Sequence, residues 1–174
     1  MKKLTFIILI AGLLAGCTSK ELNREEAFRI IKQEMQYPKV VDYDIFCSDP
    51  AMLKKVIDAG LEERGLVTVQ RTQKFKDIGK PLIEFTEKAK PHLLPTPEKD
   101  KKTDIQKVKI ADEELVEVTS IQTTAGGKQA VAEYTTAYKN VSGFSSLTNK
   151  DYNQPDTHKA YFALYDDGWR LEKK

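Results

Sequence analysis

Two pairs of carboxylates are the first residues of this chain that could carry out acid–base chemistry. Asp42 lies two residues before Asp44, and Asp166 lies directly before Asp167. Glycoside hydrolysis needs two carboxylates that face each other across a cleft. Residues i and i+2 of a strand point to the same side, so Asp42 and Asp44 are predicted to form a solvated face. The second pair precedes Gly168 and is explained by a hairpin turn.

The histidines and the inner cysteine give no catalytic signature either. His92 and His158 lie far apart in the sequence and form no metal-ligand motif. No serine-nucleophile or zinc-peptidase motif occurs. Cys47 continues a strand-like pattern, and a small apolar residue is the more common role of a free cysteine there than a nucleophile. We therefore predict that the protein is not an enzyme and has no metal and no cofactor.

Cys17 differs from Cys47, because it comes directly after a segment with the pattern of an export signal. Lys2 and Lys3 precede an apolar run over residues 4–15, and the small pair Ala15-Gly16 comes directly before the cysteine. A basic start, an apolar stretch and small residues at a cut site mark a secretory signal. A transmembrane helix would need about 20 apolar residues, which is more than this run has. An ordinary secretory signal would place a small residue, not cysteine, at the cut.

With its cysteine, this segment resembles the signal of a bacterial lipoprotein, with residues 14–17 as the lipobox. The resemblance implies that signal peptidase II removes residues 1–16, and that lipid is attached to the thiol and the new amino group of Cys17. Two or more acyl chains hold a protein stably on a membrane. We expect residues 17–22 to be a tether and the protein to be lipid-anchored in the cell envelope. In a Gram-negative source, Thr18 and Ser19 favour the outer membrane.

The charge balance bears on the partners of the processed chain. Residues 1–16 hold two lysines and no acid, so their removal leaves 26 basic and 26 acidic residues. A neutral chain has no bulk attraction for nucleic acid. Because an exported protein also meets no chromosome, we expect no nucleic-acid partner.

The first half of the chain predicts helices around one strand. Asn23 and Glu26 form a capping box for a helix that Pro38 ends. Residues 41–47 alternate as a strand does. Asp49 and Pro50 are typical of the first residues of a second helix.

Residues 50–90 resemble a winged helix. The match consists of a helix over 53–64, a strand over 65–69, a basic wing over 71–81 and a second strand over 82–89. The phrases Glu62-Glu63-Arg64-Gly65-Leu66-Val67 and Phe85-Thr86-Glu87-Lys88-Ala89 carry it. The resemblance implies DNA binding, with phosphate contacts from Lys54, Lys55, Arg71 and Lys74. Because Glu62 and Glu63 lie on the helix that would enter the groove, we interpret the segment as a reused scaffold.

The second half predicts antiparallel strands after a polar linker. Residues 95–104 hold no large apolar side chain and three lysines, which is typical of a linker. Strands are predicted over 105–110, 115–121 and 129–139, and a hairpin over 161–172. Five aromatic residues of this half could stack on sugars or bury against a partner, or form the core of the sheet: Tyr134, Tyr138, Tyr161, Tyr165 and Trp169.

These patterns predict an α+β fold with two modules. The expected parts are the signal peptide (1–16), the tether (17–22), a helix-rich winged-helix-like module (23–94), the linker (95–104) and a small antiparallel β-sheet module (105–174). The expected function is that of a non-enzymatic envelope lipoprotein that binds a protein or a glycan. The alternative is an envelope hydrolase or inhibitor accessory protein.

Overall fold

The computed structural model describes residues 21–75, 78 and 80–172, so the signal peptide and Cys17 lie outside the described residues. The elements follow in the order α1 (Arg24–Glu34), β1 (Lys39–Phe46), α2 (Pro50–Asp58), β2 (Val67–Val69), β3 (Ile83–Phe85), η2 (Glu87–His92), α3 (Glu98–Lys101), β4 (Ile105–Thr123), β5 (Gln129–Lys139), η3 (Gly143–Leu147), β6 (Asp156–Tyr165) and β7 (Gly168–Leu171). Helices and an antiparallel sheet make this an α+β protein. No helix in the described part of the chain is long and apolar enough to cross a membrane.

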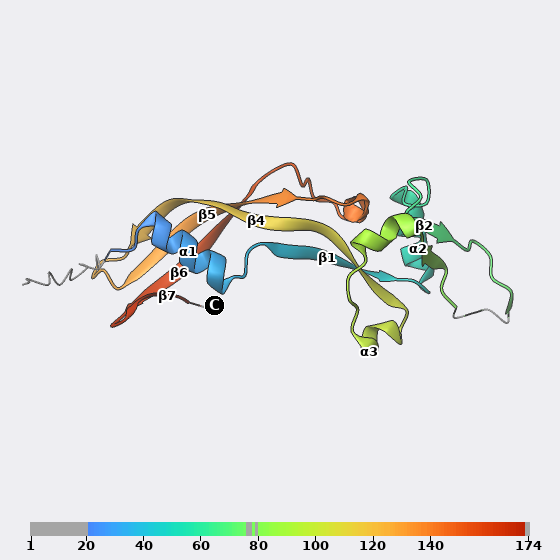
Figure 1. Ribbon diagram of the computed structural model, residues 1–174, viewed down its shortest axis with the longest axis horizontal. Coiled ribbons are helices and arrows are strands. Elements are labelled where there is room, and N and C mark those ends of the chain that lie inside the picture. Colours follow the sequence, from blue (N-terminus) through green and yellow to red (C-terminus); the bar gives the residue numbers. More distant parts are fainter. Residues whose placement is uncertain (1–20, 76–77, 79, 173–174) are drawn as a thin grey trace, which may run out of the picture.

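The main sheet is built around one long strand. Its five antiparallel strands lie in the order β1-β4-β5-β6-β7. The first part of β4 pairs with β1, from Ile105 opposite Phe46 to Glu113 opposite Lys39. The second part pairs with β5, from Asp112 opposite Lys139 to Thr123 opposite Ala130. Because β1 and β5 flank different parts of β4, the molecule is elongated along the strands (Figure 1).

Helix α1 covers one end of one face of this sheet, which we call the inner face. Its first turn is capped by the side chain of Asn23, which accepts a hydrogen bond from the backbone N–H of Glu26 at 2.9 Å. The helix contacts both β4 and β7, so the sheet curls around it. The resulting α1 core contains the buried residues Leu22, Ala27, Ile30, Ile31, Tyr37, Val118, Ala130, Ala132, Tyr134, Ala160, Phe162 and Trp169.

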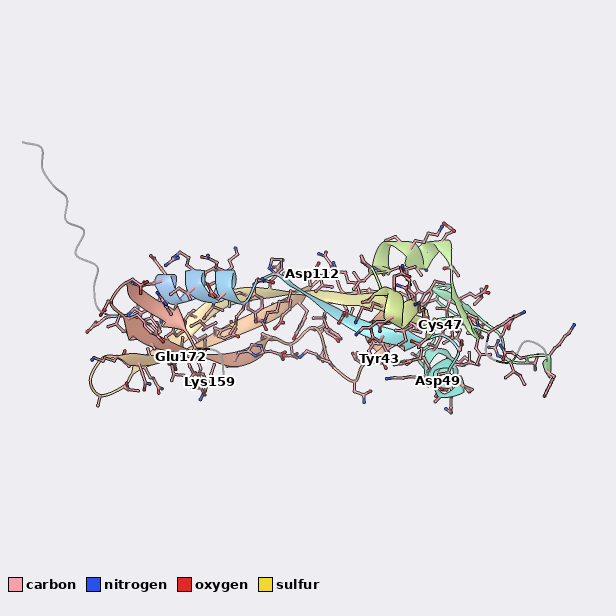
Figure 2. All side chains as sticks on the ribbon, turned by 90° about the horizontal axis from the view of Figure 1, so that it is seen from below. Tyr43, Cys47, Asp49, Asp112, Lys159 and Glu172 are labelled. Carbon is pink, nitrogen blue, oxygen red and sulfur yellow. The ribbon has the colours of Figure 1, made fainter. Side chains whose placement is uncertain are left out.

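A second hydrophobic core lies at the other end of the molecule. Asp49 caps α2 by accepting from the N–H of Ala51 at 2.8 Å. Helix α2, the β2–β3 hairpin and η3 all pack against β1 and the first part of β4. This α2 core includes Ile45, Cys47, Val56, Leu61, Val67, Ile83, Val108, Ile110, Phe144 and Leu147. Figure 2 shows the two ends: Cys47 and Asp49 lie beside α2, Lys159 and Glu172 lie at the α1 end, and Asp112 lies between them.

The elements group differently from the two predicted modules. Helix α1 and strand β1 precede residue 94 in the sequence, yet α1 packs on β4 and β7 and β1 pairs with β4. Conversely, η3 follows residue 105 but contributes Phe144 to the α2 core. The strands expected over 105–110 and 115–121 form one continuous strand. The expected linker contains the short helix α3, and Thr96 within it is buried.

The segment that resembles a winged helix has only part of that arrangement. Helix α2 and the antiparallel strands β2 and β3 follow each other in the expected order. The helix is shorter than the expected 53–64, since it ends at Asp58. The preceding element is a strand of the main sheet, not a helix packed on α2.

Candidate functional site

The five aromatic residues singled out in the sequence do not form one cluster. Tyr134 and Trp169 are 3% and 6% exposed and belong to the α1 core, with Tyr134 packed edge-on against Tyr37 at a centroid distance of 6.4 Å. They serve as core residues. Tyr138 packs against the α2 core. Only Tyr161 and Tyr165 point to the opposite side of the sheet, as shown below.

Tyr138 belongs to a polar junction between the two cores, which we define as Glu113, Thr136, Tyr138, Asp156 and His158. Nε2 of His158 lies 3.0 Å from Oγ1 of Thr136 and 3.5 Å from Oε1 of Glu113. The His158 ring stacks on Tyr134 at a centroid distance of 5.2 Å. The Glu113 side chain is only 13% exposed. The junction therefore places polar groups on the inner face of the sheet where the apolar side chains of the two cores stop.

Within this junction, Tyr138 and Asp156 interact with each other and with a charged lysine. The hydroxyl of Tyr138 donates to Oδ2 of Asp156 at 2.6 Å, and the ammonium group of Lys150 pairs with the same carboxylate. These partners, Lys150 first and Tyr138 second, hold the pKa of Asp156 below its usual range. Burial, followed by the hydrogen bond to Asp156, raises the pKa of Tyr138. The carboxylate is therefore the stable form of Asp156 in the folded chain.

The junction was not predicted from the sequence. Its one signal is the alternation along β6, because His158 shares a face with Ala160 and Phe162, which are both buried. That alternation places a histidine on the inner face of the sheet. The alternation cannot show that the side chain of Glu113, 45 positions earlier and two strands away, reaches to 3.5 Å from this histidine.

The other side of the sheet forms the open face. We define it by the residues of β5 and β6 that alternate with the core: Val131, Glu133, Thr135, Ala137, Thr157, Lys159, Tyr161, Ala163 and Tyr165. None of these side chains is buried, whereas their inward-facing neighbours Ala130, Ala132, Ala160 and Phe162 are. A sheet with one packed face and one solvated face is common in antiparallel proteins. Here the solvated face carries apolar and aromatic groups among its charges.

Tyr161 and Tyr165 give the open face its aromatic character. Tyr161 lies directly opposite Val131, and Tyr165 is 51% exposed. The guanidinium of Arg170 lies 4.9 Å from the centroid of the Tyr165 ring. Beside them, Nζ of Lys159 lies 3.6 Å from Oε1 of Glu133. This arrangement offers ring faces and a pair of opposite charges on one sheet surface, which suits binding more than bond cleavage.

The carboxylate pairs have structural partners. Asp42 and Asp44 both accept from Nζ of Lys107, at 3.1 and 2.7 Å, on the outer side of β1 and β4. Asp166 and Asp167 lie in the β6–β7 turn, and Asp167 pairs with Arg170. The first pair shares the outer face of the sheet and the second pair lies in a turn, and both positions were predicted from the sequence. In the described residues no group of three or more His, Cys, Asp or Glu side chains is placed to hold a metal ion.

Cys47 has the environment of a poor nucleophile. It is 7% exposed in the α2 core, and burial, with Asp104 nearby, raises the pKa of its thiol to about 11. The thiolate is the reactive form of cysteine. At neutral pH this side chain is therefore a neutral thiol.

Comparison with known proteins finds no match to a family model, to a curated protein or to a solved structure.

Proposed function

We propose that this chain is a lipid-anchored protein of the bacterial cell envelope that binds a protein partner on its open face. The observation that carries the binding role is the solvated side of β5 and β6, where Tyr161, Val131 and Tyr165 are accessible. Tyrosine is enriched at protein interfaces because it offers a large apolar surface with one polar group. The function is binding without catalysis.

The anchor part of the proposal rests on the sequence around Cys17 and on where the described chain begins. The lipobox-like residues 14–17 supply the lipid site. The described chain begins at residue 21, shortly before α1, and α1 lies at the end of the molecule opposite α2 (Figure 1). A lipid on Cys17 would therefore hold the α1 end close to the membrane. The α2 end would then point away from the membrane or along it. In a Gram-negative source, Thr18 and Ser19 after the cysteine support an outer-membrane location.

The α2 end is the part of the fold for which we propose a winged-helix-like origin. The order of α2, β2 and β3 supports the likeness. Three of the expected phosphate contacts have acidic or aromatic partners instead. Arg71 pairs with Glu62 and Lys54 pairs with Asp58, each at 2.5 Å. Nζ of Lys55 donates to the hydroxyl of Tyr43 at 2.6 Å. These pairings support a scaffold that does not bind nucleic acid.

Metabolic labelling tests the anchor. Cells that express the wild-type chain and are fed a clickable palmitate should incorporate the label. A Cys17→Ala chain should not incorporate it and should keep its signal segment. A Cys47→Ala chain is the matched control and should label like the wild type, because this buried thiol is not a lipid site. Label retained by Cys17→Ala would overturn the lipoprotein proposal.

Photo-crosslinking in intact cells tests the open face. A photoreactive amino acid at position 161 and another at position 135 should capture the same protein, since both lie on this face. The same probe at position 54, exposed on α2, is the control and should not capture it. Tyr165→Ala should weaken the capture from position 135. No shared product from the two positions would contradict the proposal.

A glycan is the second candidate ligand, favoured by the tyrosine rings at positions i and i+4 of β6, which lie on one side of the strand. Glycan-array binding that Tyr161→Ala abolishes would replace the protein partner with a sugar.

A further inference from the structure

Strand β1 lies at one border of the main sheet, with β4 on its other side (Figure 1). Its eight residues, Lys39–Phe46, therefore have one side that no other strand of the described chain covers. A border strand can offer its outward N–H and C=O groups to a strand from another molecule. The hydrogen bonds on the far side of β4 identify the residues of β1 that offer these groups.

Two lysines of β4 use their backbone groups on the side away from β1. The N–H of Lys107 donates to Oγ1 of Thr96 at 3.0 Å, and its C=O accepts from the N–H of Leu94 at 2.9 Å. The C=O of Lys109 accepts from the hydroxyl of Ser142 at 2.5 Å. These backbone groups are therefore not available to β1.

The residues of β1 opposite these lysines are Asp44 and Asp42. In an antiparallel pair, residues directly opposite each other either exchange hydrogen bonds or both turn their backbone groups away. The N–H and C=O groups of the two aspartates therefore point to the free side of β1. Cys47 fits this alternation, because its N–H donates to the C=O of Asp104 at 2.8 Å on the β4 side. No hydrogen bond from a turn or loop of the described residues reaches the four free groups.

The two sides of the sheet carry opposite charges along this edge. On the outer side, both aspartate side chains accept from Nζ of Lys107 and are 45% and 40% exposed, while Lys109 pairs with Asp112 at 2.6 Å. Two carboxylates therefore share one ammonium group beside the edge. On the side where α2 packs, Nζ of Lys55 lies on the hydroxyl of Tyr43 at 2.6 Å. An added strand would meet a negative charge on the outer side and a positive charge on the other.

We propose that the free side of β1 binds an extended segment of a partner protein as an additional strand, and that this segment carries basic side chains at alternate positions. Its backbone pairs with the free groups of Asp42 and Asp44, and its basic side chains lie opposite these residues. The residue between them lies opposite Tyr43 and is apolar, because Lys55 would repel a cation there. Opposite charges on neighbouring strands stabilise the pairing.

The same charges disfavour a second copy of this chain as the added strand. An antiparallel pairing that uses the free groups of all four aspartates places Asp42 of each copy opposite Asp44 of the other. Like charges directly opposite each other destabilise a strand pair. The proposal also goes beyond the partner of the open face, because β4 separates β1 from β5 and β6.

Synthetic strands test the proposal. The chain from Thr18 to Lys174, which contains every described residue, is titrated with a heptapeptide of alternating valine and lysine that has valine at both ends and a fluorescein label. We expect saturable binding by fluorescence anisotropy. The same peptide with glutamate in place of lysine should bind at least about tenfold more weakly, because like charges then lie opposite each other.

Backbone methylation separates strand pairing from simple charge attraction. The lysines lie opposite the aspartates, so their N–H groups face β1 and those of the valines face away. N-methylation of the lysines should abolish binding. N-methylation of the inner valines, which leaves the same charge, is the matched control and should change the affinity by no more than about twofold.

Variants assign the charge selection to β1. Asp42→Asn combined with Asp44→Asn should weaken binding of the lysine peptide about tenfold. Glu117→Gln combined with Asp166→Asn removes the same charge from exposed positions outside β1 and should bind like the wild type. Circular dichroism confirms that each variant is folded.

Hydrogen exchange followed by NMR locates the bound strand. The amides of Asp42 and Asp44 should exchange fast in the free chain and become protected in the complex. The amide of Tyr43, which faces β4, should be protected in both.

Four results would overturn the proposal. They are no binding of the lysine peptide, equal binding of the two methylated peptides, equal binding by the double aspartate variant, and amides of Asp42 and Asp44 that stay unprotected in the complex. Protection of these two amides by dimerisation of the chain alone, measured by analytical ultracentrifugation, would also overturn it, because a second copy would then occupy the edge.

Discussion

Replacing Ile31 by alanine tests whether α1 and the C-terminal strands share one core. Ile31 is fully buried in the α1 core together with Phe162 and Trp169. The change removes three carbon atoms, which corresponds to about 2.4 kcal/mol of transfer free energy at ~0.8 kcal/mol per buried group. The remaining cavity adds to this, so we expect the free energy of unfolding to fall by about 3 kcal/mol, within the usual 2–5 kcal/mol.

Urea unfolding followed by Trp169 fluorescence and by far-UV circular dichroism measures this loss. The neighbouring Lys32→Ala is the control, because Lys32 is exposed on the same helix and should change stability by no more than about 0.5 kcal/mol. A loss below about 1 kcal/mol for Ile31→Ala would refute the shared core. So would an unchanged Trp169 transition, because the sheet would then unfold independently of α1.

Three further changes test other parts of the structure. Asp156→Asn should destabilise the chain at neutral pH and make its stability less sensitive to acid. Because the pKa of Asp156 is lowered, its pairing with Lys150 stabilises the folded chain above about pH 4, and this stabilisation is lost as the pH falls below that value. Thermal melts at several pH values measure the effect. Cys47 should react with iodoacetamide at pH 7.5 far more slowly in the folded chain than in urea, as mass spectrometry would show, and equal rates would contradict its burial. Gly143→Ala should lower the free energy of unfolding, measured in urea, by about 1–3 kcal/mol, because the new Cβ would lie 2.6 Å from Cδ1 of Leu66. In a chain that already carries Leu66→Ala, most of this added cost should disappear.

Local signals predicted the elements of this fold well. Asn23 caps α1, Asp49 caps α2 with Pro50 at its start, and β5 has the predicted bounds of residues 129–139. The hairpin of β6 and β7 turns at Asp166 and Asp167, as expected. These features depend on a few neighbouring residues, such as a capping side chain or an alternation of apolar positions, and are therefore readable from sequence.

The grouping of these elements depends on contacts that neighbouring residues do not encode. Between the two strands expected over 105–110 and 115–121, residues 111–114 read as a break, because Asp112, Glu113 and Glu114 are acidic. In the structure this is where β4 passes from β1 to β5, and the acids have local roles: Asp112 pairs with Lys109 at 2.6 Å, and Glu113 faces His158. A polar stretch inside one strand therefore resembled a boundary between two.

The candidate site was also predicted only in part, because contacts that neighbouring residues do not encode bring its residues together. The sequence selected five aromatic residues by type, and type does not report which side of a sheet a residue occupies. The alternation of buried and accessible positions along a strand does report the side of the sheet. Tyr134 shares its face of β5 with Ala130 and Ala132, and these two residues lie opposite Phe162 and Ala160. Tyr161 and Tyr165 have the opposite alternation on β6. Applying the alternation across both strands would have separated core from surface.

Strand β4 sets the distance between the two ends of the molecule. Its 19 residues span about 60 Å at ~3.3 Å per residue. A lipid on Cys17 would hold the α1 end at the membrane surface, and an upright sheet would then carry the α2 end several tens of ångströms away from it. The open face extends along the strands between these positions. In that orientation the sheet would present its open face to a protein partner at some distance above the membrane.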